Sequence, residues 1–402
     1  MDIVIIANFC MDFSETDNGR FSYLAKKLSR QNKVEIITSD FYHITKRKRS
    51  SFPETPYQIT YISEPGYKKN ISLERFVSHF IWGKNVENYI KNRKIPDVIY
   101  CAVPSLTAAY KVARWCKKKK IRFVVDIQDL WPEAFQMIIP IPLVSKLLFT
   151  PLSIITNEIY KQADDIFGVS QAYVERALAV NKKCTSGQVV YLGTDITVFD
   201  HNSQKKIDFY KEKGELWLAY CGTLGKSYDI TCVIDALDLL GDKGKNIKFI
   251  IMGDGPQKEA FQMYAKKKQV DARFVGRLPY DKMCAVLSIC DIAVNPIIEK
   301  SVASIINKHA DYAASGLPVL NTQSSKEYIN LIESYYMGIN SIPGNAMQLA
   351  ENLEKLLVSE ELRIEMGINS RLCAEQRFDR AYTYSKIVNI LVNGEQYEEK
   401  NN

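Results

Sequence analysis

The chain has 402 residues, 46% hydrophobic and 25% charged, and its 53 Lys and Arg outnumber its 46 Asp and Glu, for a formal charge of +7. This composition is that of a soluble globular protein, and the length favours two domains over a single core. The nine cysteines are scattered without a CxxC pair and only four histidines are present, which disfavours a disulfide framework or a zinc site and fits a reducing cytoplasm.

The basic excess lies in the first half. Residues 1–200 hold 28 Lys and Arg against 20 Asp and Glu, whereas residues 201–402 hold 25 against 26. The densest runs are Lys46–Arg49 and Lys117–Lys120, which are consistent with a solvated loop and a helix end, or with a surface that meets an anionic membrane. No reading motif or aromatic-interleaved platform accompanies them, so we expect no nucleic-acid partner.

The chain opens with a strand, a helix and a second strand. Met1 and Asp2 lead directly into the apolar run Ile3–Ala7, which predicts a buried strand and is too short for a secretory signal. Helical spacing from Phe21 to Leu28 and the run Val34–Thr38 follow, which predicts a parallel sheet with a right-handed crossover. The intervening loop has no GxGxxG, so an NAD-dependent dehydrogenase is disfavoured.

Further strands are expected at Asp97–Cys101 and Ile121–Asp126, with a helix between them. The second of these strands leads into the loop Gln128–Glu133. In open parallel sheets, loops at the carboxyl ends of strands line the ligand crevice. Asp129 is therefore a site candidate, with a helix N-cap before Pro132 as the alternative.

The most apolar window is Phe135–Ile155, and it contains three prolines and Lys146. Prolines argue against a helix that spans a membrane. One interpretation is a segment that lies in the lipid interface, with Lys146 reaching the headgroups. The other is a pair of helices buried between domains.

The expected linker is made of Leu192–Asp195 and the polar stretch at residues 201–214, and a second series of strands follows it. These are expected at Leu216–Cys221, Ile247–Met252, Arg273–Val275, Ile292–Asn295 and Val319–Asn321. We therefore expect an α/β protein of two successive doubly wound domains, residues 1–200 and 201–378, with an amphipathic helix within residues 379–402.

Three of these strands end in glycine-bearing loops. Gly222–Ser227 superficially suggests a P-loop, but a Walker A motif needs glycine where Tyr220 stands. Such a loop can still bind an anion through its amides, with Lys226 as a point charge. Similar loops follow the next two strands, at Gly253–Pro256 and Gly276–Pro279.

The stretch Asp291–Leu320 predicts a strand, a polar loop, a helix from about residue 306 to 314 and another strand. Lys308 in the first helical turn and Asp311 three residues later project on nearly the same side. They could hold a phosphate at the helix start and a sugar hydroxyl one turn deeper. The alternative is a surface ion pair at helical spacing.

With these strand ends in place, the chain resembles a glycosyltransferase of the GT-B fold, of the retaining family 4 type. The second half resembles that family throughout. In the first half the matching pieces are Asn18-Gly19-Arg20, Asp129-Leu130-Trp131-Pro132-Glu133, Ala163–Ser170 and Gly193-Thr194-Asp195. The resemblance implies two Rossmann-like domains facing a cleft, an acceptor in the first, a nucleotide-sugar donor in the second, and a C-terminal helix that crosses back to the first.

The resemblance also implies roles for single residues. Asp311 matches the ribose-binding carboxylate, and a carboxylate suits paired hydroxyls. The other donor-binding candidates are Gly19, Gly222, Thr223, Lys226, Gly253, Asp254, Gly255, Arg277, Leu278, Pro279, Ser304, Asn307 and Lys308. The acceptor-binding candidates are Asn18, Arg20, Asp129, Trp131 and Glu133.

Two positions depart from the family pattern. Ala303 stands where a glutamate is common eight residues before the ribose carboxylate, and Thr223 replaces an arginine. Lys226 and Lys308 are thus the expected catalytic cations for the departing diphosphate, without a metal or other cofactor. Asp129 is the expected group that orients the acceptor hydroxyl or takes its proton.

The resulting prediction is a cytoplasmic enzyme, peripheral on the inner face of the cell membrane. It would transfer a sugar, with retention, from a UDP-sugar to a lipid-linked or oligosaccharide acceptor in surface polysaccharide assembly. A nucleotide-sugar 2-epimerase and a non-catalytic nucleotide-sugar-binding partner of another transferase are the alternatives.

Overall fold

The computed structural model describes the chain except for residues 14–18, 51–52, 71, 135–141, 300–304 and 395–402, and except for the side chains of 142–146. The chain forms two compact units, Met1–Val190 with Tyr384–Asn402, and Tyr191–Thr383. The first boundary lies earlier than the expected one at residue 200. The reason is that α6 (Ile196–Ser203) buries Ile196 and Phe199 and packs on two helices of the second unit, α9 (Tyr280–Leu287) and α10 (Asn307–Ala314).

The first unit is built on a seven-stranded sheet in which every paired strand is parallel. Its order is β5 (Gln58–Ile62), β2 (Lys33–Ser39), β1 (Asp2–Ile6), β6 (Val98–Val103), β7 (Arg122–Ile127), β8 (Asp165–Gly168) and β9 (Gln188–Val189). The interior strand β1 is apolar at successive positions because both faces of a parallel sheet are covered.

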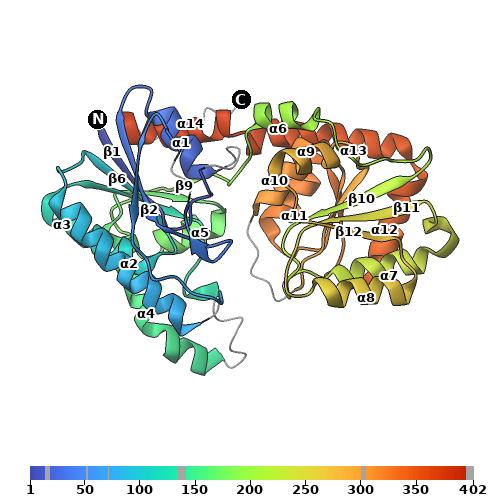
Figure 1. Ribbon diagram of the computed structural model, residues 1–402, viewed down its shortest axis with the longest axis horizontal. Helices are drawn as coiled ribbons and strands as arrows, with labels where there is room; N and C mark the ends of the chain where they lie inside the picture. The colour runs from blue at the N-terminus through green and yellow to red at the C-terminus, as the bar shows by residue number, and fades with distance from the viewer. Residues whose placement is uncertain (14–18, 51–52, 71, 135–141, 300–304, 395–402) are drawn as a thin grey trace. The chain divides into compact units, whose positions relative to one another are not determined.

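Helices cover both faces of this sheet (Figure 1). Ile3 and Ile5 share a core cluster with Leu24 of α1 and Ile387 of α14, so Val4 and Ile6 point to the opposite face. The helices are α1 (Arg20–Leu28), α2 (Leu73–Asn92), α3 (Leu106–Lys119), α4 (Pro142–Gln162), α5 (Gln171–Leu178) and α14 (Arg380–Asn393).

Two sequence expectations change in this unit. The part of the apolar window that the structure describes lies in one helix, α4, which continues through Pro151, and residues 135–141 of the window lie outside the described residues. The basic run at residues 46–49 is not a solvated loop, because it forms β4 (Arg47–Lys48), antiparallel to β3 (Phe41–Tyr42). Within it Arg49 is buried and donates to three backbone carbonyls, those of Ser39, Met11 and Cys10.

The second unit contains a six-stranded parallel sheet. Its order is β12 (Ala272–Gly276), β11 (Ile247–Met252), β10 (Leu216–Cys221), β13 (Ile292–Asn295), β14 (Val319–Asn321) and β15 (Gly338–Asn340). Its helices are α6, α7 (Ile230–Leu240), α8 (Lys258–Lys268), α9 (Tyr280–Leu287), α10 (Asn307–Ala314), α11 (Lys326–Tyr335), α12 (Ala346–Val358) and α13 (Glu360–Cys373), with short helical turns at Gly241–Gly244 and Ala374–Phe378. The expected pair of Rossmann-like domains is confirmed.

Candidate functional site

The loops after β10 and β11 touch through their backbones. A Cβ on Gly253 would lie 1.8 Å from the Gly222 oxygen, and one on Gly255 would lie 2.4 Å from the Leu224 oxygen. The Gly222 and Leu224 amides donate to the Met252 and Asp254 carbonyls at 3.0 and 2.9 Å. Three predicted donor-binding glycines therefore meet at one sheet edge. Gly253 and Gly255 are needed there because nothing larger than hydrogen fits between the loops.

Lys308 lies against this edge as a buried cation. Its Nζ lies 4.2 Å from the centroid of the Tyr220 ring and 4.1 Å from that of Tyr228, and a Cβ on Gly222 would lie 3.3 Å from it. Among the described residues Nζ has no hydrogen-bond partner. Burial lowers the pKa of Lys308 to about 7, and a bound anion would favour its charged form.

Asp311 lies one turn further along α10. It is 7% exposed, and its Oδ1 accepts a hydrogen bond from the Tyr280 hydroxyl at 3.0 Å. That hydroxyl lies 2.7 Å from Thr194 Oγ1. Burial raises the pKa of Asp311 to about 6, against the lowering effect of the Tyr280 hydrogen bond. The surface ion pair is excluded, because Lys308 and Asp311 are both buried.

His309 was not predicted from the sequence. Its ring stacks on Tyr328 with centroids 3.6 Å apart, and its Nδ1 accepts from the Ile306 amide at 3.3 Å. Its Nε2 is buried without a hydrogen-bond partner in the described part of the chain. Burial, and then the charge of Lys308, hold its pKa well below the usual value, so a neutral imidazole lies in the first turn of α10.

The other donor-binding candidates are less enclosed. Asp254 is exposed, and its carboxylate accepts from the Gly255 amide at 2.8 Å and lies 3.5 Å from Lys258 Nζ. Leu278 is half-buried, while exposed side chains belong to Thr223, Lys226, Arg277, Pro279 and Asn307. Ser304, like Ala303, lies outside the described residues.

The acceptor-binding assignment of Arg20 is corrected by the structure. Its guanidinium is buried, with Nε and Nη2 donating to the Asp126 carboxylate at 2.9 and 3.0 Å. Its Nη1 donates to the Val190 carbonyl at 3.2 Å and to the Tyr384 hydroxyl at 3.0 Å. Arg20 thus ties α1, β7 and α14 together instead of facing a ligand.

The remaining candidates of the first unit lie near the end of β7. Asp129 is half-buried, and its Oδ2 accepts from the Trp131 indole at 3.1 Å. Burial raises the pKa of Asp129. Glu133 is ion-paired with Arg176 at 2.6 Å. Gly19 precedes α1, and a Cβ there would lie 2.5 Å from Ser22 Oγ, which would have to move, while Asn18 lies outside the described residues.

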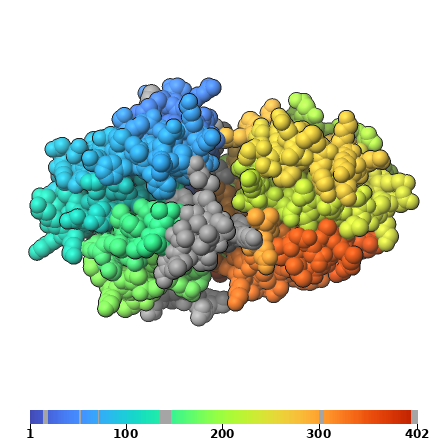
Figure 2. Space-filling view, turned by 90° about the horizontal axis from the view of Figure 1, so that it is seen from below, coloured from blue at the N-terminus to red at the C-terminus, as the bar shows by residue number. Residues whose placement is uncertain are grey.

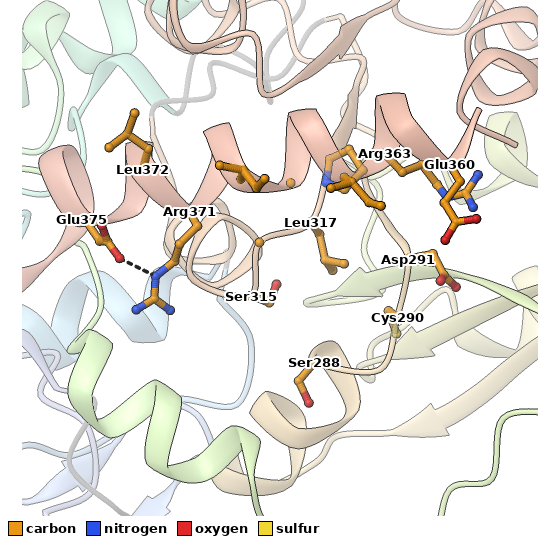
Figure 3. A pocket seen from close by; sticks show the side chains of 15 residues that line it. Ser288, Cys290, Asp291, Ser315, Leu317, Glu360, Arg363, Arg371, Leu372 and Glu375 are labelled. Carbon is orange, nitrogen blue, oxygen red and sulfur yellow. Dashed lines mark hydrogen bonds and ion pairs between the residues drawn. The ribbon is translucent and has the colours of Figure 1, made fainter. Parts of the chain in front are cut away.

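A cavity of about 690 Å³ lies elsewhere on the second unit (Figure 3). Asp291 and Pro318, which line it, precede β13 and β14, so the cavity lies at the amino ends of these strands and Lys308 does not line it. Arg371, also in its wall, pairs with Glu375 at 2.8 Å and with Asp200 at 2.6 Å. Among the described residues, no group of three His, Cys, Asp or Glu could hold a metal.

Comparison with known proteins gives the class of the second unit. Residues 202–372 match the family described as glycosyl transferases group 1. The chain therefore contains a domain of that family. A curated relative, 2-deoxystreptamine glucosyltransferase of Streptomyces kanamyceticus, is 21% identical over 156 residues, which are 38% of this chain and 39% of that protein. The chain thus spans well under half of the curated relative it matches.

Solved structures resemble the whole chain. WaaG, a glycosyltransferase involved in lipopolysaccharide biosynthesis, matches with a TM-score of 0.69 and 16% identity over 98% of this chain and all of WaaG. Anabaena HepE, crystallised with UDP and glucose, matches with a TM-score of 0.71 and 15% identity over 98% of this chain and 100% of HepE. The fold is GT-B, as the sequence resemblance implied.

Proposed function

We propose that the protein transfers a sugar from a nucleotide-diphosphate sugar to a hydroxyl of a lipid-linked glycan acceptor, with retention, in surface polysaccharide biosynthesis. The observation that carries the proposal is that α10 holds two buried groups one turn apart, the Asp311 carboxylate and the Lys308 Nζ, which has no hydrogen-bond partner in the described part of the chain. The cation suits a diphosphate and the carboxylate suits ribose hydroxyls. The UDP complex of HepE supports UDP as the nucleotide, and the part of WaaG in lipopolysaccharide biosynthesis supports the glycan class.

The proposed reaction breaks the bond between the anomeric carbon and the donor phosphate oxygen, and forms one from that carbon to the acceptor oxygen. Negative charge grows on the departing diphosphate, where Lys308 and Lys226 stabilise it. The acceptor hydroxyl gives up its proton to Asp129, whose raised pKa suits a general base. We propose that no metal takes part, and full activity after treatment with a chelator would support this.

The proposed membrane contact uses the first unit. Leu147, Leu148 and Ile154 of α4 are exposed apolar side chains, and the basic run at the end of α3 is fully exposed. In Figure 2, α2 and α3 lie within the part of the surface that is coloured blue to cyan. No helix in the described ranges has both the length and the hydropathy to cross a bilayer. If the protein fails to float with anionic liposomes at low salt, the peripheral contact is wrong.

Activity is tested by screening nucleotide sugars for thermal stabilisation and then offering the best one to lipid-linked acceptors. Transfer of the sugar supports the proposal, and Asp129→Asn should retain donor binding while losing transfer. Conversion of the donor without acceptor would instead identify the epimerase, which the match to a transferase family does not favour. Binding without turnover on any acceptor would identify a non-catalytic partner.

A further inference from the structure

The first unit contains a cluster of cationic and aromatic side chains, of which only Trp131 belongs to a motif named in the sequence. They come from the loops after β1, β3, β5 and β7 and from α2. Arg75 lies at its centre, so we call it the Arg75 cluster. Its members are Phe9, His43, Lys46, Tyr67, Arg75, His79 and Trp131.

The Arg75 guanidinium is surrounded by aromatic rings. Its Cζ lies 4.6 Å from the centroid of the Trp131 ring and 5.5 Å from the centroids of both Phe9 and Tyr67. Nη1 donates to the Asn70 carbonyl at 2.8 Å. Nε is buried and has no hydrogen-bond partner within the described ranges. The side chain is half-buried, and its buried Nε is a hydrogen-bond donor that is not used.

His79 supplies a second buried nitrogen without a partner. The side chain is 4% exposed, and its ring stacks on Trp131 with centroids 5.7 Å apart and planes 3° from parallel. Its Nε2 has no hydrogen-bond partner among the described residues and lies 4.0 Å from Glu64 Oε1. An unused buried nitrogen is costly unless a ligand or water meets it.

The carboxylates near the cluster are bound to other groups. Glu64 accepts from Asn8 Nδ2 at 2.9 Å and from Ser78 Oγ at 2.7 Å. Asp129 accepts from the Trp131 indole. In the described part of the chain, neither carboxylate lies within ion-pair distance of Arg75 or Lys46.

Arg75 and Lys46 are therefore held close together without an ion pair among the described residues, and the Asp129 and Glu64 carboxylates act on Arg75 only from a longer distance. Lys46 Nζ lies 4.7 Å from the centroid of Tyr67, a ring that Arg75 also faces, and 3.1 Å from His43 Nδ1. Burial, and then the charge of Arg75, lower the pKa of Lys46 to about 8. Burial, and then the charges of Lys46 and Arg75, lower the pKa of His43 and His79 to about 3. Both imidazoles are therefore neutral near pH 7. A bound anion would relieve the repulsion between the cations.

We propose that the Arg75 cluster binds an anionic group of the glycosyl acceptor, either the phosphate of a lipid carrier or the carboxylate of an acidic sugar. The inference rests on the proposed function in calling the ligand an acceptor. Arginine is suited to both groups because its planar fork matches phosphate and carboxylate oxygens. The position of Asp129, bonded to Trp131 of the cluster, would bring the reacting hydroxyl next to the anchored anion.

The test is titration calorimetry of the full chain with inorganic pyrophosphate, glucuronate and neutral glucose, in the background Lys308→Met so that the donor site does not compete. We expect one or both anions to bind, glucose not to bind, and Arg75→Gln to weaken the anion at least about tenfold, as expected for loss of a charge-assisted hydrogen bond. Arg114→Gln is the matched control, because Arg114 also lies over a ring, that of Tyr110 at 5.5 Å, but outside the cluster.

Preferential binding of pyrophosphate would identify the lipid phosphate as the source, and preferential binding of glucuronate the acidic sugar. Equal affinities in the Arg75→Gln and Arg114→Gln variants, or no binding of either anion, would overturn the inference. If Arg75→Gln does not fold, Lys46→Gln provides the same comparison. Because no donor or turnover enters the measurement, binding without transfer would contradict only the proposed function. An unchanged KM for the acceptor in an active Arg75→Gln enzyme would contradict only this inference.

Discussion

The two units present ligand-binding groups in different ways. In the second unit the candidate site is made of backbone at strand ends, with Lys308 and Asp311 added from a single helix. In the first unit it is made of long side chains from four loops and a helix, centred on Arg75. A backbone-built site suits the invariant part of a substrate, such as a nucleotide diphosphate, whereas a side-chain-built site can be altered residue by residue. If the proposed function is correct, we expect substitutions in the first unit to change which acceptor is used.

The largest expected effect tests the backbone-built site. Gly253→Ala would place a Cβ 1.8 Å from the Gly222 oxygen, and overpacking typically costs about 1–3 kcal/mol, with clashes against backbone at the upper end. We expect a clearly lower Tm for the second unit by calorimetry, with loss of UDP binding. Gly225→Ala is the matched control, because its Cβ would meet only Thr223 Cγ2, at 3.8 Å. Equal Tm values for the two variants would show that the loops do not need to touch.

Lys308→Met and Lys226→Met compare how much the buried lysine and the exposed lysine contribute to UDP binding. Loss of a hydrogen bond from a charged group should weaken UDP binding ~10- to 100-fold in calorimetry. The same change should raise Tm, because it removes a buried charge without a counterion. Lys226→Met should weaken UDP less, since its side chain is exposed. A larger loss with Lys226→Met would make the loop lysine the principal anion-binding group.

Asp311 should make donor affinity depend on pH. Only the carboxylate accepts hydrogen bonds from both ribose hydroxyls, and its pKa is about 6, so UDP affinity should fall as the pH drops from 7 to 5. Asp311→Asn should bind UDP about tenfold more weakly at pH 7 and lose this dependence.

The same carboxylate should make folding stability depend on pH. The pKa of Asp311 in the folded state lies above the ordinary value of 3.8. The contribution of Asp311 to stability is therefore fully present below pH 3.8 and is lost as pH rises through 6. If UDP affinity still fell steeply between pH 7 and 5 in Asp311→Asn, another group would be responsible for that fall.

The smallest expected effect is the uptake of protons by the protein when UDP binds. Lys308 has a pKa of about 7 in the free protein, and a diphosphate would raise it, so UDP binding at pH 8 should take up a fraction of a proton. Enthalpies measured in buffers of different ionisation heat should reveal this uptake, and Lys308→Met should abolish it. Uptake that persists in the variant would place the titrating group elsewhere.

The sequence predicted much of the fold because the strand runs are short, apolar and regularly separated by helical spacing. The spacing of Lys308 and Asp311 also predicted that they lie on one side of a helix, since residues three apart share a face. Their burial depended on Tyr220, Tyr228 and Tyr280, which come from distant elements and follow no local pattern. Arg20 was misassigned for the same reason, because its partner Asp126 lies far along the chain.

The sequence singled out Trp131 as an acceptor-binding candidate, but it did not predict the Arg75 cluster to which Trp131 belongs. Its members are spread from Phe9 to Trp131, and no two of them form a motif. Lys46 was noticed only as part of a basic run, where a neighbouring residue, Arg49, is buried and bonded to carbonyls. Charge density along a sequence therefore did not distinguish a ligand-facing cation from a structural one.

The helix α14 has a consequence for how the protein is made. The first unit consists of Met1–Val190 and Tyr384–Asn402, and its core includes Tyr384, Ile387 and Leu391. Arg122 donates to the carbonyls of Ile390 and Leu391 at 2.8 and 3.2 Å. A ribosome therefore releases the whole of the second unit before it supplies the residues that complete the first. The unit that begins first in synthesis is the last to acquire its full core.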